Sequence, residues 1–288
     1  PAFQTSLLSN VDGRQLFSCR YGLNMSPAAK YAVYTDKKNF YAYEVSTGIT
    51  RNLTEGIWEN WGVNENGDYD FWVYNSGIIG WGEDDETVYL CDQYDIWKLD
   101  LTGKERAFCL TNGYGKKNKI IFSVIDDMVN LHSGKPHLIN ADKKISFVAF
   151  DTNNKQNGFY YKRNTVEHGD PIKLLMEDAT YWVPTVPLSF PGLTSDFRKP
   201  LKAGNAEVYL VAHSTARESP NLFTTRDFKH FTELTHNYPE RNYNWYTTEL
   251  VTWPNSKGVK LQGVLYKPEN VDSTKKYPLI FYHYRKAS

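Results

Sequence analysis

Short runs in which apolar and polar residues alternate recur along most of the chain, and Gly, Asn, Asp and Pro residues separate them. The first group comprises residues 30–36 (KYAVYTD), 39–45 (NFYAYEV) and 49–54 (ITRNLT). Alternation with a period of two predicts half-buried β-strands, and the polar residues between the runs predict tight turns. The pattern therefore predicts antiparallel sheets built from consecutive strands.

The same three-strand unit repeats with a period near sixty residues. A pair beginning with Leu ends each unit, at Leu53-Thr54, Leu110-Thr111, Leu174-Leu175 and Leu234-Thr235, with spacings of 57, 64 and 60 residues. The later strands are predicted at residues 87–93, 95–101, 106–111, 144–151, 157–163, 170–176, 207–214, 220–227 and 230–235. This repeat is typical of a β-propeller, in which each sheet buries its faces against its neighbours. About four blades are visible.

The strand that opens each blade is harder to place. The best candidates are residues 77–81 (GIIGW) and 136–140 (PHLIN). Residues 181–204 are rich in Pro and Gly and too long for a turn within a blade. We expect this segment to carry the first strand of the fourth blade and a surface loop.

The pattern changes near the C-terminal end. Residues 249–253 (ELVTW) predict a strand, residues 254–258 (PNSKG) predict a turn, and residues 259–266 alternate as a returning strand. Residues 277–284 (YPLIFYHY) are apolar and aromatic without alternation, which suits a strand covered on both faces, as in an α/β domain. We therefore predict propeller blades over residues 1–247 and the first strands of an α/β domain over 248–288.

The composition argues against several classes of protein. Lys plus Arg equals Asp plus Glu at 33 each, so no net charge draws the chain to nucleic acid or to anionic lipid. No apolar run approaches the roughly 18 residues that a membrane span needs. The first residues, PAFQTSLLSNVDG, show neither the basic nor the apolar region of a signal peptide. Aromatic residues make up 15% of the chain, which favours an all-β architecture.

The sequence gives little support for a metal or cofactor site. Cys19, Cys91 and Cys109 lack C-x-x-C spacing and are interpreted as small buried hydrophobic residues, with a Cys91–Cys109 disulfide as the alternative. His230 and His236 form no H-E-x-x-H motif, so we expect solvated or hydrogen-bonded histidines. We predict no cofactor and no metal.

Two loops have residue types that are also found in ion-binding sites. Residues 113–117 (GYGKK) lack the spacing of a phosphate-binding loop, so we interpret them as a turn between blades. Residues 83–86 (EDDE) form an acidic turn that solvation explains, with a Ca²⁺ site as the weaker alternative.

Residues 248–284 resemble the junction between propeller and hydrolase domain in the prolyl oligopeptidase and dipeptidyl peptidase family of serine peptidases. The matching features are Trp253, Gly258, Gly263, residues 265–268 (LYKP) and residues 275–278 (KKYP). Residues 80–101, with Gly80-Trp81, Asp84-Asp85 and the run YDIWKLDL, resemble a propeller blade of bacterial members. The resemblance implies that residues 248–288 begin an α/β-hydrolase domain.

The resemblance also implies a function and a location. The family cleaves short peptides, here of dipeptidyl or prolyl type, while the propeller restricts access to the active site, and an extracytoplasmic location is expected. No serine has the G-x-S-x-G context of the nucleophile elbow, so we expect this chain to stop before the catalytic triad and to be inactive alone. The peptide substrates belong to the parent enzyme.

One catalytic position is implied within the chain. In the family, the tyrosine that ends the K-K-Y-P strand donates its hydroxyl to the oxyanion hole, and this register places Tyr284 there. The alternative is a tyrosine that packs at the end of a strand. Arg285 and Lys286 follow where the family usually has small residues.

A different class of function remains open. A non-catalytic propeller that acts as a binding module would show the same blades, and only a reading frame that continues into G-x-S-x-G distinguishes the two. Four blades are fewer than the seven or eight that the family usually closes. Because an open arc leaves sheet faces and strand edges exposed, we expect self-association or completion by a segment supplied in trans.

Overall fold

The computed structural model describes residues 5–19, 22–36, 38–57, 61, 77–125, 137–140, 143–163, 169–181 and 200–282. The chain divides into two compact units. The first comprises residues 1–213 with 221–236, and the second comprises residues 214–220 with 237–288. The predicted boundary between residues 247 and 248 stays a prediction.

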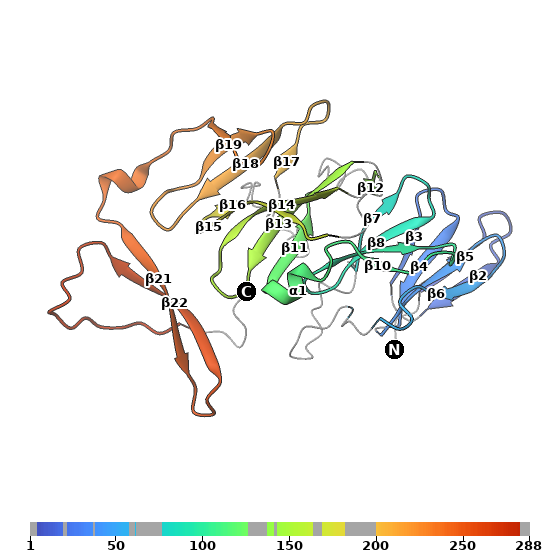
Figure 1. Ribbon diagram of the computed structural model, residues 1–288, viewed down its shortest axis with the longest axis horizontal. Helices are drawn as coiled ribbons and strands as arrows, with labels where there is room; N and C mark the ends of the chain where they lie inside the picture. The colour runs from blue at the N-terminus through green and yellow to red at the C-terminus, as the bar shows by residue number, and fades with distance from the viewer. Residues whose placement is uncertain are drawn as a thin grey trace. The chain divides into compact units, whose positions relative to one another are not determined.

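Among the described residues of the first unit, four mainly antiparallel sheets follow one another in chain order as blades (Figure 1). The first contains β3 (Leu23–Met25), β4 (Tyr31–Thr35), β5 (Phe40–Glu44) and β6 (Thr50–Asn52). The second contains β7 (Ile78–Gly82), β8 (Thr87–Cys91), β9 (Ile96–Asp100) and β10 (Phe108–Cys109). The third contains β11 (Ile120–Val124), β13 (Lys144–Asp151), β14 (Asn157–Arg163) and β15 (Ile172–Glu177). The fourth contains β16 (Thr180–Tyr181), β18 (Tyr209–Ser214), β19 (Asn221–Thr225) and β20 (Phe231–Glu233), with β17 (Leu201–Lys202) paired to β18. The predicted all-β fold with four blades is confirmed.

Hydrophobic cores lie between successive sheets. Val88 and Leu90 of β8 pack in the core shared with the first sheet, whereas Tyr89 between them packs in the core shared with the third sheet. Phe159 of the third sheet lies with its ring 4.6 Å from that of Phe228, in the next core. Because adjacent side chains of a strand point to opposite faces, the second and third sheets each contribute to two cores. This stacking gives the alternating pattern its physical basis.

The Leu-Thr pairs mark a repeated hydrogen-bond arrangement, which we call the Thr–Asx bridge. The buried Thr111 hydroxyl accepts the Ile96 N–H at 3.0 Å and donates to the carboxylate of Asp95 at 2.6 Å. The same bridge recurs at Thr54 with Phe40 and Asn39, and at Thr235 with Leu222 and Asn221. Each bridge connects a threonine, the second residue past the outer strand, to the start of the neighbouring strand. The third sheet has Leu174-Leu175 in place of the Leu-Thr pair, and there the backbone of Gly158 approaches Leu175 closely.

One opening strand was predicted in the wrong sheet. Strand β7 opens the second blade as expected, but residues 136–140 do not open the third. Instead β12 (Leu138–Ile139) pairs in parallel with β7, where the Trp81 N–H donates to the His137 carbonyl at 2.9 Å. The third blade is opened by β11, which follows the short helix α1 (Tyr114–Asn118). The local residue pattern cannot distinguish these two arrangements, because both segments are apolar and only their partners differ.

A hairpin that the pattern did not reveal covers the outer face of the first blade. It consists of β1 (Thr5–Leu8) and β2 (Gln15–Cys19). The ring of Phe17 lies 4.7 Å from that of Tyr34 and 4.8 Å from that of Tyr43. The hairpin therefore buries aromatic surface on the face that points away from the second blade.

The second unit contains the predicted C-terminal hairpin. Strand β21 (Tyr246–Pro254) pairs along its whole length with β22 (Lys260–Pro268). The side chain of Asn255 accepts the N–H groups of Lys257 and Val259, both at 2.9 Å, and Gly258 has a φ of 76°. The turn residues thus reverse the chain as predicted. A 3₁₀ helix (Pro239–Asn242) precedes the hairpin.

The predicted buried strand over residues 277–284 is not formed in the part that the structure describes. Residues 277–282 belong to no strand, and Leu279 and Ile280 are 74% and 92% exposed. A strand needs neighbouring strands to accept and donate its ladder hydrogen bonds, and the only sheet described in this unit is the β21–β22 hairpin. Within the described residues, no helix is long and apolar enough to cross a bilayer.

Candidate functional site

The predicted oxyanion-hole residue cannot be placed. Tyr284 lies outside the described residues, as do Arg285 and Lys286. Its catalytic role therefore stays a prediction that rests on the sequence resemblance.

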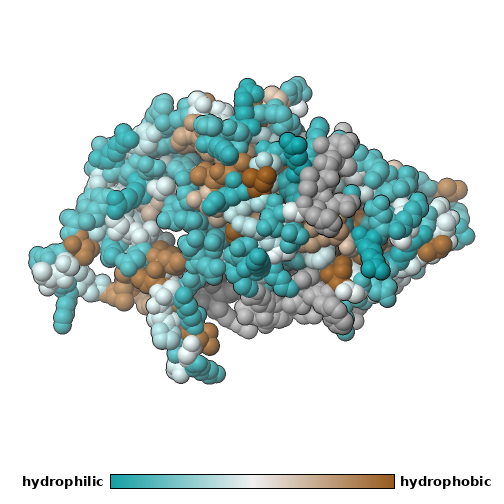
Figure 2. Space-filling view, in the orientation of Figure 1, coloured by the Kyte–Doolittle hydropathy of each residue, from teal (hydrophilic) through white to brown (hydrophobic). Residues whose placement is uncertain are grey.

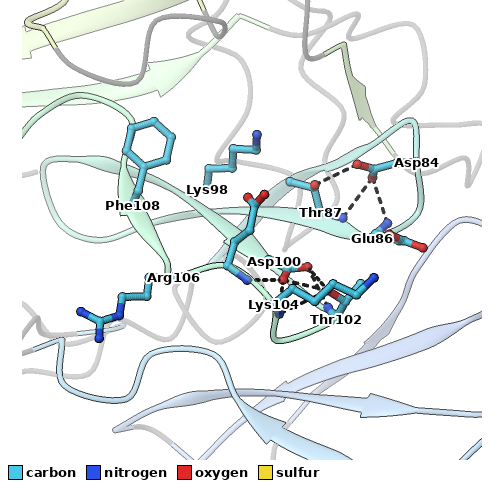
Figure 3. Close-up of a pocket in the computed structure, with 10 residues that line it drawn as sticks. Asp84, Glu86, Thr87, Lys98, Asp100, Thr102, Lys104, Arg106 and Phe108 are labelled. Atoms are coloured by element: carbon cyan, nitrogen blue, oxygen red, sulfur yellow. Dashed lines mark hydrogen bonds between the residues drawn. The ribbon is translucent and has the colours of Figure 1, made fainter.

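The structure shows a hollow on the second blade that the sequence did not indicate (Figure 3). It has a volume of about 660 Å³ and is lined by the turns at residues 84–87 and 102–106 together with strands β9 and β10. Both turns lie at the same end of the sheet because β7–β8 and β9–β10 are antiparallel pairs. Most of its lining residues carry charged side chains.

The two aspartates of the hollow are engaged in their own turns. Asp84 accepts the N–H groups of Glu86 and Thr87 at 2.9 and 3.1 Å and the Thr87 hydroxyl at 3.1 Å. Asp100 accepts the N–H groups of Thr102, Lys104 and Glu105 at 2.6 to 2.8 Å. These hydrogen bonds hold the pKa of Asp100 below its ordinary value although partial burial opposes the shift. Both carboxylates therefore stabilise the turns.

The cations of the hollow form no ion pair with any residue that the structure describes. Lys98 is half-buried, whereas Lys104 and Arg106 are exposed. Their side chains diverge in Figure 3, so they do not converge on one point. The arrangement can bind a charged ligand, but it does not supply the nucleophile and base that peptide hydrolysis needs.

Residues 113–117 connect the second and third blades, as predicted, but most of them belong to the short helix α1 rather than to a turn. Its N–H groups already bind an anion from the same chain, because Asp95 accepts those of Gly115 and Lys116, both at 2.9 Å. A Cβ at Gly115 would lie 2.6 Å from the Tyr94 carbonyl oxygen, so only glycine fits there. Burial raises the pKa of Asp95, although the hydrogen bonds to its carboxylate oppose this. The loop has no free anion site on these two N–H groups.

The acidic turn at residues 83–86 connects two blades. Buried Asp85 accepts the Ser26 hydroxyl at 2.9 Å and the Ala28 N–H at 2.8 Å. Asn140 donates to Glu83 at 2.8 Å. Among the described residues, no group of His, Cys, Asp and Glu is arranged to hold a metal ion. Among the described residues, this turn thus stabilises the contact between the first and second blades.

The two histidines lie beside acidic side chains, as expected, whereas only one of the three cysteines is fully buried. His230 lies 2.7 Å from Asp227 and His236 lies 3.3 Å from Glu233, both at the surface. All three cysteines are free, so the alternative disulfide does not form. Cys19 is buried, whereas Cys91 and Cys109 are only partly buried. Burial raises the pKa of the Cys109 thiol to about 11, which makes it a poor nucleophile at neutral pH.

A cluster that sequence reasoning missed lies where the third and fourth sheets meet. The hydroxyl of Tyr181 donates to the Glu177 carboxylate, and His213 Nε2 lies 3.1 Å from the same oxygen. Burial and this hydrogen bond raise the pKa of Tyr181. Because Glu177 and His213 are 36 positions apart, no local pattern could have brought them together.

Comparison with known proteins gives a fold match. No family model matches the chain, and no curated protein matches it. A solved structure described as a dipeptidyl aminopeptidase IV from Bacteroides ovatus ATCC 8483 is 13% identical, with a TM-score of 0.54 over 94% of this chain and 38% of that chain. A post-proline cleaving enzyme from Rickettsia typhi is 10% identical, with a TM-score of 0.48 over 92% of this chain and 36% of that chain.

The chain has a β-propeller fold, similar to the part of the dipeptidyl aminopeptidase IV structure that it covers. It spans little more than a third of each of these solved structures. At 13% identity the likeness concerns the fold, so activity and substrates are matters for proposal.

Proposed function

We propose that this chain is part of a longer serine peptidase of the prolyl oligopeptidase type, which cleaves short peptides of dipeptidyl or prolyl type. Its blades would restrict access to an active site carried by the α/β-hydrolase domain. The observation that carries the proposal is the junction sequence at residues 248–284, which follows four blades of the matching fold. The chain itself would be inactive, since it lacks the nucleophile elbow.

The residues of the hairpin in the second unit support the proposal that a sheet covered on both faces exists in the longer protein. One face presents Leu250 and Val264, which are register partners, and the other presents Val251 and Leu265. Val264 is 50% exposed, and Figure 2 shows hydrophobic surface over β21 and β22. A ribbon that is apolar on both faces is expected where both faces are covered, whereas a lone two-stranded sheet in water is marginally stable.

The role proposed for Tyr284 follows from the same junction. A hydroxyl preorganised toward the oxyanion would contribute roughly 3 to 4 kcal/mol to acyl transfer. Tyr284→Phe in the longer protein should then lower kcat by about two to three orders of magnitude. Tyr282→Phe, two residues earlier on the same segment, is the matched control and should leave kcat within about twofold.

The decisive experiment uses the longer protein encoded by the continuous reading frame. It should react with a fluorophosphonate probe at one serine and hydrolyse a dipeptidyl or prolyl chromogenic substrate, while residues 1–288 alone do neither. Absence of both labelling and hydrolysis in the longer protein would refute the peptidase proposal. It would favour the second candidate, a non-catalytic binding module, for which the charged hollow of the second blade is the supporting observation.

We also propose that residues 1–288 self-associate in isolation. Exposed apolar side chains are concentrated in the second unit, where Leu279, Ile280 and Phe281 are 74%, 92% and 68% exposed. Patches of this kind bind other apolar surfaces. Light scattering should show dimers or larger species, and a stable monomer across the concentration range would contradict the proposal.

A further inference from the structure

We infer that the hollow on the second blade binds a small carboxylate that carries a neighbouring apolar group, as at the C-terminal residue of a short peptide. Lys98 would bind the carboxylate and Phe108 would pack against the apolar group. This inference goes beyond the proposed function, because every residue involved lies on the second blade and none belongs to the proposed catalytic part. It holds or fails independently of peptidase activity.

Strand register places Lys98 between two aromatic residues. On β9, Lys98 is the partner of Tyr89 on β8 and of Phe108 on β10, so the three side chains share one face of the sheet. Tyr89 is buried, and Lys98 and Phe108 are half-buried. Figure 3 shows Lys98 and Phe108 beside each other along the hollow. The site therefore combines an ammonium group with an apolar ring.

The ammonium of Lys98 has no carboxylate partner among the described residues. A partly buried charge loses hydration, and an anion that binds to it restores a favourable interaction. Asp84 and Asp100, two of the carboxylates that line the hollow, instead accept the turn N–H groups. Among the described residues this position therefore lacks a carboxylate, and an external one would supply it.

The remaining charges limit the ligand to a single anionic group near Lys98. Lys104 and Arg106 point in other directions in Figure 3, so they would not bind the same carboxylate. Glu86 and Glu105 are exposed at the hollow and would repel a ligand with several negative charges. A volume of about 660 Å³ is sufficient for an amino acid or a short peptide.

The test compares two probes that differ only in charge. N-acetyl-L-phenylalanine carries the carboxylate, and N-acetyl-L-phenylalaninamide replaces it with a neutral amide. Titration of the ¹⁵N-labelled 288-residue chain at neutral pH and low ionic strength should give saturable shifts in β9 and β10 with the acid. The amide should bind about tenfold more weakly, as expected for loss of one charge-assisted hydrogen bond.

Two variants assign the effect to Lys98. Lys98→Met keeps most of the apolar stem and removes the charge, and it should lower the affinity for the acid to that for the amide. Lys104→Met removes a charge of the same sign from the exposed turn and should change affinity less than about twofold. Equal binding of acid and amide, full retention of binding by Lys98→Met, or no saturable shift up to about 20 mM of either probe would each overturn the inference.

Discussion

The Thr–Asx bridge at Thr111 offers the sharpest test of how the blades are stabilised. Thr111→Val preserves the shape of the side chain but removes its hydroxyl. The buried N–H of Ile96 then loses its acceptor, and the buried carboxylate of Asp95 loses a donor at 2.6 Å. An unsatisfied buried N–H costs about 1 to 3 kcal/mol, and a hydrogen bond to a charged group contributes about 1.5 to 3 kcal/mol.

The two costs do not add in full, because Asp95 still accepts the N–H groups of Gly115 and Lys116. We therefore expect Thr111→Val to lower the free energy of unfolding by about 3 kcal/mol. With a slope of about 3 kcal/mol per molar urea, the midpoint should fall by about 1 M. Tryptophan fluorescence during urea unfolding measures this, since Trp97 lies on the same sheet.

The matched control is Thr102→Val on the turn between β9 and β10. The Thr102 hydroxyl donates to a carboxylate in the same way, to Asp100 at 2.8 Å, but neither residue is fully buried. Water can replace the lost hydrogen bond, so the free energy of unfolding should fall by less than about 1 kcal/mol. Equal destabilisation by the two variants would refute the reasoning, because burial would then not explain the cost.

Three further predictions concern other positions. Gly158→Ala should destabilise the third blade by about 3 kcal/mol in thermal unfolding, since its Cβ would overlap the carbonyl of Leu175. A value within about 0.5 kcal/mol of the unmodified chain would contradict the close approach. At pH 8 a thiol with a pKa of about 11 is only ~0.1% thiolate. Iodoacetamide should therefore modify Cys109 far more slowly in the folded chain than in urea, as followed by mass spectrometry. Equal rates of modification would contradict this prediction. Hydrogen bonds from His230 hold the pKa of Asp227 below its ordinary value, so the stability that Asp227 contributes is present above pH 4 and declines as the pH falls. Because Asp227 is 45% exposed, Asp227→Asn should cost less than about 1 kcal/mol at pH 7, and a cost that does not diminish toward pH 3 would count against this linkage.

Local patterns were sufficient for much of the fold. The alternating runs define the strands of the four sheets because a period of two is imposed by strand geometry and does not depend on the partner. The Leu-Thr pairs predicted the repeat, and the structure shows that the threonine makes a hydrogen bond that recurs in three of the four blades. The turn at residues 254–258 likewise formed where its residues predicted it.

The remaining features of the fold and of the candidate site depend on contacts between residues far apart in the sequence. Residues 136–140 and β11 carry similar apolar residues, and only the contact of β12 with β7 determines which one opens a blade. The contact between Glu177 and His213 and the position of Lys98 beside Phe108 exist only once sheets and strands are placed side by side. Residues 277–282 have the composition of a buried strand yet form none here, because composition sets a preference for the extended chain while ladder hydrogen bonds and cover come from neighbouring elements.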